Sequence, residues 1–444
     1  MIAIVVSRAD STSDHIGEHL LAVGDWTARE DRTRPDEAGG GRYYRTDGFE
    51  LRSFEEMHLD LDGVAAAFDD PDLLVFASRH AGDTGALLTA HFTGNFGPAE
   101  YGGEDGRLAR ACPNAHARVL AALADHAPAG YEVGMECTHH GPSAVGVPSM
   151  FVELGSGEEQ WTDPKAARAV ARAILDLDGV TAHRERQLVG FGGGHYAPRF
   201  TRIVRETDWA VGHVGSDWNL AEMGAPEANR EVVAAAFERS GAEYAVVDGD
   251  RPDLETVVES LGYRVVTETW VREVDGVPLA LAETVEGALC PVSEGLRFGA
   301  DAGATPADAD VEVATLPADL VDDASGVDAA RTVNAVAAHT VAYETTENGN
   351  RVAERVAVTA TARLDALLDA LAALLAEKYE SVERTADAVV ANEVAFDPEK
   401  ARRRGVDEGP AFGRLANGDS VTVDDETVYP EEVQTERTHR YPLR

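Results

Sequence analysis

The stretch "ECTHHGPS", residues 136–143, places a carboxylate, a thiol and two adjacent imidazoles directly before a Gly-Pro turn. General acid–base catalysis and metal binding use these side chains most often. His139 and His140 offer nitrogens and Glu136 offers oxygens, a set compatible with zinc and an open position for water. The spacing does not by itself establish zinc, because the sequence has neither HExxH nor a paired CxxC. The alternative interpretation is the end of a buried strand.

The orientation of these side chains depends on how far the preceding strand extends. If it continues to His139, Cys137 and His139 point to one face of the sheet. Glu136, Thr138 and His140 then point to the other face. At most one imidazole would then reach the substrate or metal, and its neighbour would orient it or bind elsewhere.

Histidines before residue 220 concentrate where predicted strands end. In open α/β sheets the carboxyl ends of strands share one edge, so side chains there can converge on one crevice. A single histidine after a strand is more often a hydrogen-bonded loop residue, but several together favour a site. The positions are His80, His91, His139, His140, His195 and His213.

The stretch "GFGGGHYAPR", residues 190–199, is a second candidate for chemistry. Three glycines after a strand let the backbone approach a ligand and present N–H groups to a phosphate or a developing oxyanion. Because Pro198 follows at once, this is not a GxGxxG motif opening a long helix, and a dinucleotide fold is disfavoured. The alternative is a tight turn that needs positive φ.

The elements that position these residues alternate apolar runs with helical patterns over residues 1–282, which predicts an α/β sheet covered on both faces. Asp163 and Pro164 form a typical helix start. The predicted strands are 2–6, 73–78, 86–92, 131–136, 149–154, 187–191, 210–214, 244–249 and 264–271, and the predicted helices are 115–126, 164–177 and 227–241.

The residue composition and the periodicity of the sequence change near residue 283. Residues 283–325 are rich in Ala, Asp, Gly and Pro without clear periodicity, which predicts a linker. Beyond it, leucines between 364 and 375 recur at the spacing of an amphipathic helix. We therefore expect a catalytic domain at 1–282, a linker, and a smaller α+β C-terminal extension of unknown role at 326–444.

The charge balance is extreme, with 39 basic against 79 acidic residues and a formal net charge of −40. Lysine occurs only at Lys165, Lys378 and Lys400. This composition is typical of a halophilic protein from a salt-saturated cytoplasm, where ions screen self-repulsion; the alternative is an ordinary acidic protein. Counterion release contributes little in molar salt, so acidity does not exclude a nucleic acid held by stacking, shape and a few arginines.

The cysteine content and the apolar runs indicate the cellular compartment of the protein. Three cysteines, Cys112, Cys137 and Cys290, suit a reducing cytosol better than a disulfide framework. No uninterrupted apolar run has the roughly 18 residues of a membrane span, and the N-terminus lacks a signal-peptide pattern. We therefore expect a soluble cytoplasmic protein without a membrane partner.

Four ordered motifs, at residues 78–97, 136–143, 151–161 and 190–201, resemble those of the archaeal and plant type of D-aminoacyl-tRNA deacylase. The resemblance covers about residues 1–275. It implies a zinc-dependent hydrolase that cleaves the ester joining a D-amino acid to the tRNA 3′ end. It also implies a three-layer α/β/α fold with a central mixed sheet, akin to phosphorylases and peptidyl-tRNA hydrolases.

The resemblance and the residues together suggest roles in catalysis. His140 or His195 would act as base or metal ligand, and His80, His139 and Glu136 would complete the polar cluster. The candidate zinc ligands are His91, His139, His140 and His195.

Candidate substrate contacts come from the first and fourth of these motifs. The amides of Gly193 and Gly194 would bind the oxyanion, and Arg199 would meet the terminal phosphate. Asn95 would hold the substrate amino group or the terminal ribose, and Tyr196 would also contact the substrate. Glu104 and Asp217 stand where the family tends to carry lysine, which argues against phosphate contacts there.

Two other classes of protein compete with this interpretation. A zinc peptidase or a nucleoside phosphorylase-like enzyme can use the same architecture, since a fold does not determine its function. A non-catalytic tRNA-binding protein is the second alternative, although the full histidine set argues against it. The expected partner is the 3′ end of D-aminoacyl-tRNA, and no stable protein partner is inferred.

Overall fold

An eight-stranded mixed sheet forms the larger part of the first of two units, Met1–Asp275, in the computed structural model, which describes residues 1–424 and 426–443. The strand order is β2-β3-β4-β1-β5-β8-β6-β7. Neighbours among β4, β1, β5 and β8 are parallel, and β6 runs antiparallel to β8. The strands are β1 Ile2–Ser7, β2 Thr27–Asp31, β3 Gly41–Thr46, β4 Phe49–Phe54, β5 Leu73–Arg79, β6 Leu87–His91, β7 Glu132–Met135 and β8 Ser149–Gly155.

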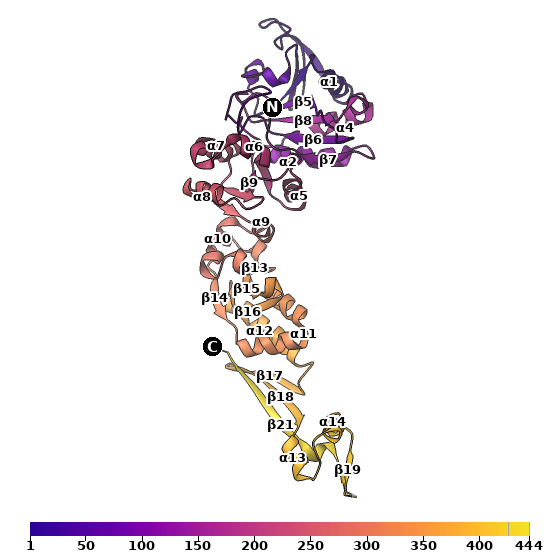
Figure 1. Ribbon diagram of the computed structural model, residues 1–444, viewed down its shortest axis with the longest axis vertical. Helices are drawn as coiled ribbons and strands as arrows, with labels where there is room; N and C mark the ends of the chain where they lie inside the picture. The colour runs from indigo at the N-terminus through magenta and orange to yellow at the C-terminus, as the bar shows by residue number, and fades with distance from the viewer. Residues whose placement is uncertain (425, 444) are drawn as a thin grey trace. The chain divides into compact units, whose positions relative to one another are not determined.

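The central strands of this sheet are apolar because both of their faces are covered. Three helices, α1 Ser11–Val23, α2 Pro113–His126 and α4 Pro164–Leu175, pack on one another and on one face, and Figure 1 shows α1 and α4 beside β5 and β8. On the other face Phe76 and Phe151 form a cluster with residues of the 58–68 segment. The core therefore holds the ends of β5, β6, β7 and β8 in fixed positions.

A second, fully parallel sheet completes the first unit, with the order β10-β9-β11-β12. Its core joins Val189 and Phe191 to the apolar faces of α7 and α8. Gly190 lets α5 approach, because an added Cβ would lie 2.6 Å from the Phe200 ring. The bounds are β9 Gln187–Phe191, β10 Ala210–Gly215, β11 Tyr244–Val247, β12 Arg264–Val266, α3 Glu158–Trp161, α5 Pro198–Glu206, α6 Asp217–Met223, α7 Arg230–Ser240, α8 Pro252–Ser260 and α9 Glu268–Glu273.

The α/β class with a mixed sheet is confirmed, although the unit has two sheets where one central sheet was expected. The helix start at Asp163 is also confirmed, since its side chain accepts a hydrogen bond from the Lys165 amide. The strand predicted at 264–271 is wrong beyond Val266. The Thr267 side chain accepts from the Trp270 amide and starts α9 there.

The second unit, Gly276–Arg444, begins before the expected boundary at 282. The segment 283–325 is not a linker, because it contains two strands and parts of two helices. Leu316, Leu320 and Val321 are buried there in the core of the unit. Its first elements are α10 Leu279–Ala288, β13 Leu296–Phe298, β14 Glu312–Thr315, α11 Ala318–His339, β15 Ala342–Thr346 and β16 Arg351–Val358, with sheet order β13-β15-β16-β14.

The remainder of this unit is α+β, as predicted. The leucine-rich helix is α12 Thr361–Leu375, and its apolar stripe packs in the same core as Tyr343 and Val389. A three-stranded and a two-stranded sheet follow. Their elements are β17 Ser381–Arg384, β18 Ala388–Phe396, α13 Pro398–Arg403, α14 Pro410–Ala416, β19 Val421–Val423, β20 Glu426–Val428 and β21 Gln434–Pro442. Over the described residues of both units, no helix has the length and apolar character needed to cross a membrane.

Candidate active site

Carboxylates and imidazoles from five segments meet at one edge of the first unit. The His139 ring centroid lies 4.2 Å from that of His91, 4.1 Å from that of His140 and 4.6 Å from that of His195. His80 follows β5, and Glu153 belongs to β8. The expected shared carboxyl edge does not account for this cluster, because β6 and β7 run antiparallel to β5 and β8. The side chains meet instead where β8 lies between β5 and β6.

Glu136 is the first residue after β7 and is 1% exposed. Its Oε2 lies 2.7 Å from His195 Nε2 and 3.7 Å from His139 Nε2. Its Oε1 lies 3.2 Å from His80 Nδ1. Burial alone would raise the pKa of Glu136, but the hydrogen bonds from His195 and His80 hold this pKa well below its ordinary value. Glu136 is therefore a buried anion that organises the imidazoles around it.

Glu153 is a second buried anion, which the sequence analysis did not single out. Its two oxygens lie 3.7 Å from His80 Nδ1 and 3.5 Å from His91 Nε2. Burial would raise the pKa of Glu153, but these two histidines lower it to about 2. A signal was present in the sequence, because a carboxylate within the apolar run "SMFVELG" is buried only when it has partners.

Two histidines beside these anions, His80 between Glu136 and Glu153 and His195 beside Glu136, are held as imidazolium ions. Burial would lower the pKa of His80, but its hydrogen bonds to Glu136 and Glu153 raise it to about 11. Burial would likewise lower the pKa of His195, but Cys137 and Glu136 raise it to about 10. His80 Nε2 lies 3.2 Å from the hydroxyl oxygen of Tyr196. Gly155 leaves room for His80, because an added Cβ would lie 2.7 Å from the His80 Cβ.

His91 and His140 present nitrogens that lack hydrogen-bond partners. His91 Nδ1 lies 2.9 Å from the backbone oxygen of Phe92 and donates to it, which turns Nε2 towards the cluster. His91 Nε2 and His140 Nδ1 are buried without a hydrogen-bond partner, as is one oxygen of Glu153. Burial is the main cause that holds the pKa of His140 well below its ordinary value, and the neighbouring His139 and His91 lower it further. His140 is therefore neutral.

These unpartnered atoms fit a metal ion. Imidazole nitrogens and carboxylate oxygens form the usual zinc donor set, and a buried donor without a partner is costly unless a ligand or ion satisfies it. Three groups have donor atoms within 4.8 Å of one another, namely His91 with His139 and His140, Cys137 with His139 and His195, and His80 with Glu136 and Glu153. His195 therefore shares a group with His139 but not with His91 or His140.

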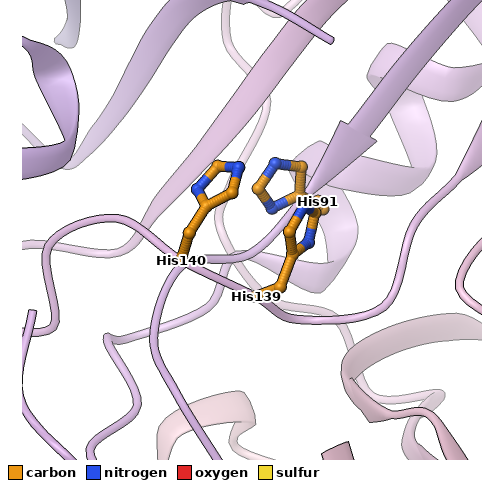
Figure 2. Close-up of side chains that lie close together, drawn as sticks. All are labelled: His91, His139 and His140. Atoms are coloured by element: carbon orange, nitrogen blue, oxygen red, sulfur yellow. The ribbon is translucent and has the colours of Figure 1, made fainter. Parts of the chain in front are cut away.

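The expectation that His139 and His140 face opposite ways is wrong. The strand ends at Met135, so the alternation of faces does not reach the histidines. The Cys137 amide instead donates to the backbone oxygen of His195, in the loop after β9, and the Thr138 amide donates to that of Val214 in β10. His140 then adopts a φ of 39°, which bends the chain. Both rings consequently lie beside the His91 ring (Figure 2).

Cys137 is fully buried, and its Sγ lies 3.6 Å from His195 Nδ1. Burial would raise the pKa of Cys137, but hydrogen bonds from His139 and His195 lower it to about 7. No sequence motif indicates a basic partner for this thiol, but the fold places His195 beside it. The thiol has no exposed surface, so it faces the imidazoles rather than a substrate.

Some of the predicted substrate contacts are already engaged within the protein, and others remain exposed. The Gly193 amide donates to Asp217 Oδ1 at 2.8 Å, so it does not offer a free donor, whereas Gly194 is exposed. Arg199 forms ion pairs of 3.0 Å with Asp248 and 3.2 Å with Glu268.

Asn95 and His213 both serve the scaffold. Asn95 Nδ2 donates to the backbone oxygen of Gly102 at 3.0 Å and holds the adjacent loop. His213 lies between Thr138 Oγ1 at 2.9 Å and the backbone oxygen of Ala109 at 2.8 Å. It is buried away from the imidazole cluster and has a structural role.

A pocket of about 190 Å³ opens beside the cluster. His139 and His140 lie in its wall together with Asn95, and the exposed rings of Tyr101 and Trp218 also line it. A second pocket of about 370 Å³ lies between β6, β7 and α5, next to Tyr196. Ligands therefore have space on either side of the cluster.

A buried imidazole–carboxylate centre at the strand ends of an α/β unit, with pockets beside it, defines an enzyme of the hydrolase class. The sequence pattern of the D-aminoacyl-tRNA deacylase family matches residues 67–266. The D-aminoacyl-tRNA deacylase of Halorubrum lacusprofundi is 56% identical and aligns with 100% of this chain and 97% of its own length. The chain belongs to the D-aminoacyl-tRNA deacylase family, which confirms the resemblance carried by the four motifs.

Other relatives support the same assignment over the whole chain. The D-aminoacyl-tRNA deacylase of Natronomonas pharaonis is 56% identical and covers 99% of this chain and 100% of its own. The D-aminoacyl-tRNA deacylase of Methanoregula boonei is 33% identical and covers 97% of this chain and 96% of its own length. A crystal structure of a conserved protein of unknown function is 30% identical, with a TM-score of 0.55 over 61% of this chain and 96% of that chain.

Proposed function

We propose that the chain hydrolyses the ester bond of D-aminoacyl-tRNA and releases the D-amino acid and the tRNA. The observation that carries the proposal is the buried cluster around Glu136 and Glu153 in a chain of this family. An aminoacyl ester is already activated, so its hydrolysis needs a positioned water, a proton acceptor and donors for the oxyanion. The enzyme would thereby recycle tRNA charged with the wrong enantiomer.

Zinc is the proposed cofactor. His91, His139 and His140 would hold it through nitrogens that lie within 4.8 Å of one another, with Glu153 beside His91. A zinc ion bound there would supply a water of near-neutral pKa and polarise the ester carbonyl. The hydrogen bond from His91 Nδ1 to the backbone of Phe92 would orient the ring for this task.

His195 is suited to protonate the leaving ribose oxygen. Its pKa of about 10 makes it a proton donor at neutral pH, and its side chain is 29% exposed whereas Glu136 is fully covered. A shift of the ring away from the Cys137 thiol would free the Nδ1 proton for the ribose oxygen as the ester bond breaks, while Glu136 holds Nε2. The neutral His140 would act as base or metal ligand.

Donors for the oxyanion would come from the glycine loop and from His80. Of the two predicted amides, that of Gly194 remains the candidate, because the Gly193 amide is engaged by Asp217. Arg199 is not proposed as a phosphate contact, since Asp248 and Glu268 already neutralise it. Tyr196 would reach the substrate beside His80.

The decisive experiment compares single-turnover deacylation of D-tyrosyl-tRNA and L-tyrosyl-tRNA in high salt, with and without a chelator. We expect the D-ester to be cleaved selectively, chelation to abolish cleavage, and added zinc to restore it. Full activity in a rigorously metal-free preparation contradicts the zinc assignment alone. Absence of D-ester cleavage with zinc present, beside turnover of a peptide or a nucleoside, assigns the site to another hydrolase.

The working environment proposed for this enzyme is a salt-saturated cytoplasm. The net charge of −40 is spread over the chain, and screening by salt reduces its repulsion. We expect the deacylation rate and the melting temperature to rise together with KCl concentration. Maximal activity at low salt contradicts the halophilic assignment.

A further inference from the structure

Exposed aromatic side chains of the first unit gather at the active site. Tyr101 is 66%, Trp218 is 40% and Tyr196 is 36% exposed, and among the described residues of this unit no other large apolar side chain is exposed. Tyr101 and Trp218 line the 190 Å³ pocket that includes His139 and His140. Large exposed rings at one place mark a binding surface rather than a core.

The backbone that carries both rings is held firmly. The Gly141 amide donates to the backbone oxygen of Tyr101 at 2.9 Å, and Asn95 Nδ2 donates to the neighbouring Gly102 oxygen. Trp218 lies in α6, whose start is fixed by a 2.7 Å hydrogen bond from the hydroxyl of Ser216 to the side-chain oxygen of Asn219. These contacts involve the scaffold and leave the two rings free. The backbone at both rings is therefore ordered before a ligand binds, which lowers the entropic cost of binding.

The charge of the pocket excludes a phosphate group as its occupant. The charged residues in its wall are Glu100 and Glu222, and the lining contains no arginine or lysine. Acidic groups beside aromatic faces favour a planar, uncharged ring that carries amine donors. The volume is also small, because pockets for drug-sized ligands measure about 300–1,000 Å³. A single nucleobase with exocyclic amine hydrogens matches the rings, the carboxylates and the size.

We propose that Tyr101 and Trp218 form a stacking site for the terminal adenine of the aminoacylated tRNA. Because His139 and His140 form the adjoining wall, a base held there places its own ribose ester at the imidazole cluster. Stacking replaces phosphate contacts as the source of affinity, which suits a protein that works where salt screens charge. This inference rests on the proposed deacylation and names the part of the substrate that the pocket binds.

The test uses two small D-tyrosyl esters, 3′-O-D-tyrosyl-adenosine and D-tyrosine methyl ester, with the full chain in high salt. The wild-type enzyme should prefer the adenosine ester. The ratio of kcat/KM for the two esters should fall about 10-fold or more in Trp218→Ala and Tyr101→Ala, the scale of losing one stacked base. Trp218→Phe should keep the ratio, because it retains a ring. Tyr429→Ala is the matched control, since Tyr429 is 51% exposed in the other unit.

Other outcomes of this experiment overturn the inference. An unchanged ratio in both alanine variants removes the base from this pocket, and an equal loss on both esters assigns the pocket to the aminoacyl group. A ratio is insensitive to the fraction of folded enzyme, so partial misfolding does not mimic the effect. If wild-type enzyme cleaves neither ester, D-tyrosyl-tRNA tests the proposed function, and quenching of tryptophan fluorescence by adenosine, absent in Trp218→Phe, decides whether the base binds.

Discussion

His195 Nε2 lies 2.7 Å from Glu136 Oε2, while Nδ1 of the same ring faces the Cys137 thiol at 3.6 Å. Glu136 and Cys137 are adjacent in the chain, whereas His195 comes from the glycine loop after β9. One imidazole from the loop after β9 is thus fixed between two neighbours that follow β7. The carboxylate controls the proton on this ring.

The carboxylate of Glu136 should be required for turnover. Glu136→Gln removes the charge that stabilises protonated His195 and His80, so the pKa of each should fall towards its ordinary value. We expect kcat for D-tyrosyl-tRNA to fall about 100-fold or more, the usual scale for losing an acid–base group. Glu132→Gln, an exposed position in β7, should keep the rate. A near-native rate for the Glu136 variant would assign this carboxylate to the scaffold only.

Stability should depend on pH on both sides of neutrality. The pKa values of His80 and His195 are raised from 6.5 to about 11 and about 10, so their stabilisation is complete below pH 6.5 and lost as pH rises through these values. The pKa of Glu153 is lowered from 4.5 to about 2, so its stabilisation is present above pH 4.5 and lost towards pH 2. The buried His58, His116, His140 and His213 have lowered pKa values, so they cost stability as pH falls below 6.5. Thermal melting at constant high salt, with chelator present, should therefore show a maximum near pH 6.5.

The alkaline arm of this profile has its own control. His195→Gln should flatten the loss of stability as pH rises towards 10, because the variant has no raised pKa at that position. An identical alkaline arm in the variant and in the wild-type protein would mean that other groups cause it.

Replacement of either His139 or His140 with alanine should reduce both zinc content and deacylation. Both rings lie beside His91, so unequal effects of the kind expected for opposite faces are no longer predicted. Atomic absorption measures the zinc, and single-turnover assays measure a rate that should fall about 100-fold. His126→Ala is the control, because His126 pairs with Asp176 on a helix. Near-native zinc content and rates for both variants would return the motif to a structural role.

Cys137→Ser should lower the rate only mildly. The thiol is fully buried, so it cannot attack a substrate without rearrangement, and serine retains a small polar group beside His195. Cys290→Ser, in the other unit, serves as the control. A folded Cys137→Ser enzyme with normal zinc content and no activity would replace the proposed mechanism with thiol chemistry, while a loss of zinc would make Cys137 a ligand.

A fragment of residues 1–275 should fold alone and retain the whole cluster, since every group of the site belongs to this unit. A fragment ending at 282 is a poorer choice, because it cuts α10. Zinc content, melting and deacylation of D-tyrosyl-tRNA in high salt check the expectation. Aggregation of the 1–275 fragment would show that the second unit completes its core.

Local patterns predicted most strands and helices of the first unit, because alternation of apolar residues and capping residues acts over neighbouring positions. Asp163 illustrates this, since its cap depends on residues two positions away. The same patterns placed histidines at strand ends, but β6 and β7 run antiparallel to β5, so a single shared edge does not explain how they meet. The sequence by itself therefore determined the family, the fold class and the set of histidines available for chemistry.

Only the tertiary structure decided how these groups meet. The turn after Met135 depends on pairing with residues 195 and 214, far along the chain, so a local pattern continued the strand to His139 instead. Glu153 acquires its partners from β5 and β6, and Tyr101 meets Trp218 across a pocket that no motif marks. The segment 283–325 forms strands and helices because Leu316, Leu320 and Val321 pack in a core with residues far along the chain. Such contacts are set by packing between distant segments, which the order of residues along one element does not encode.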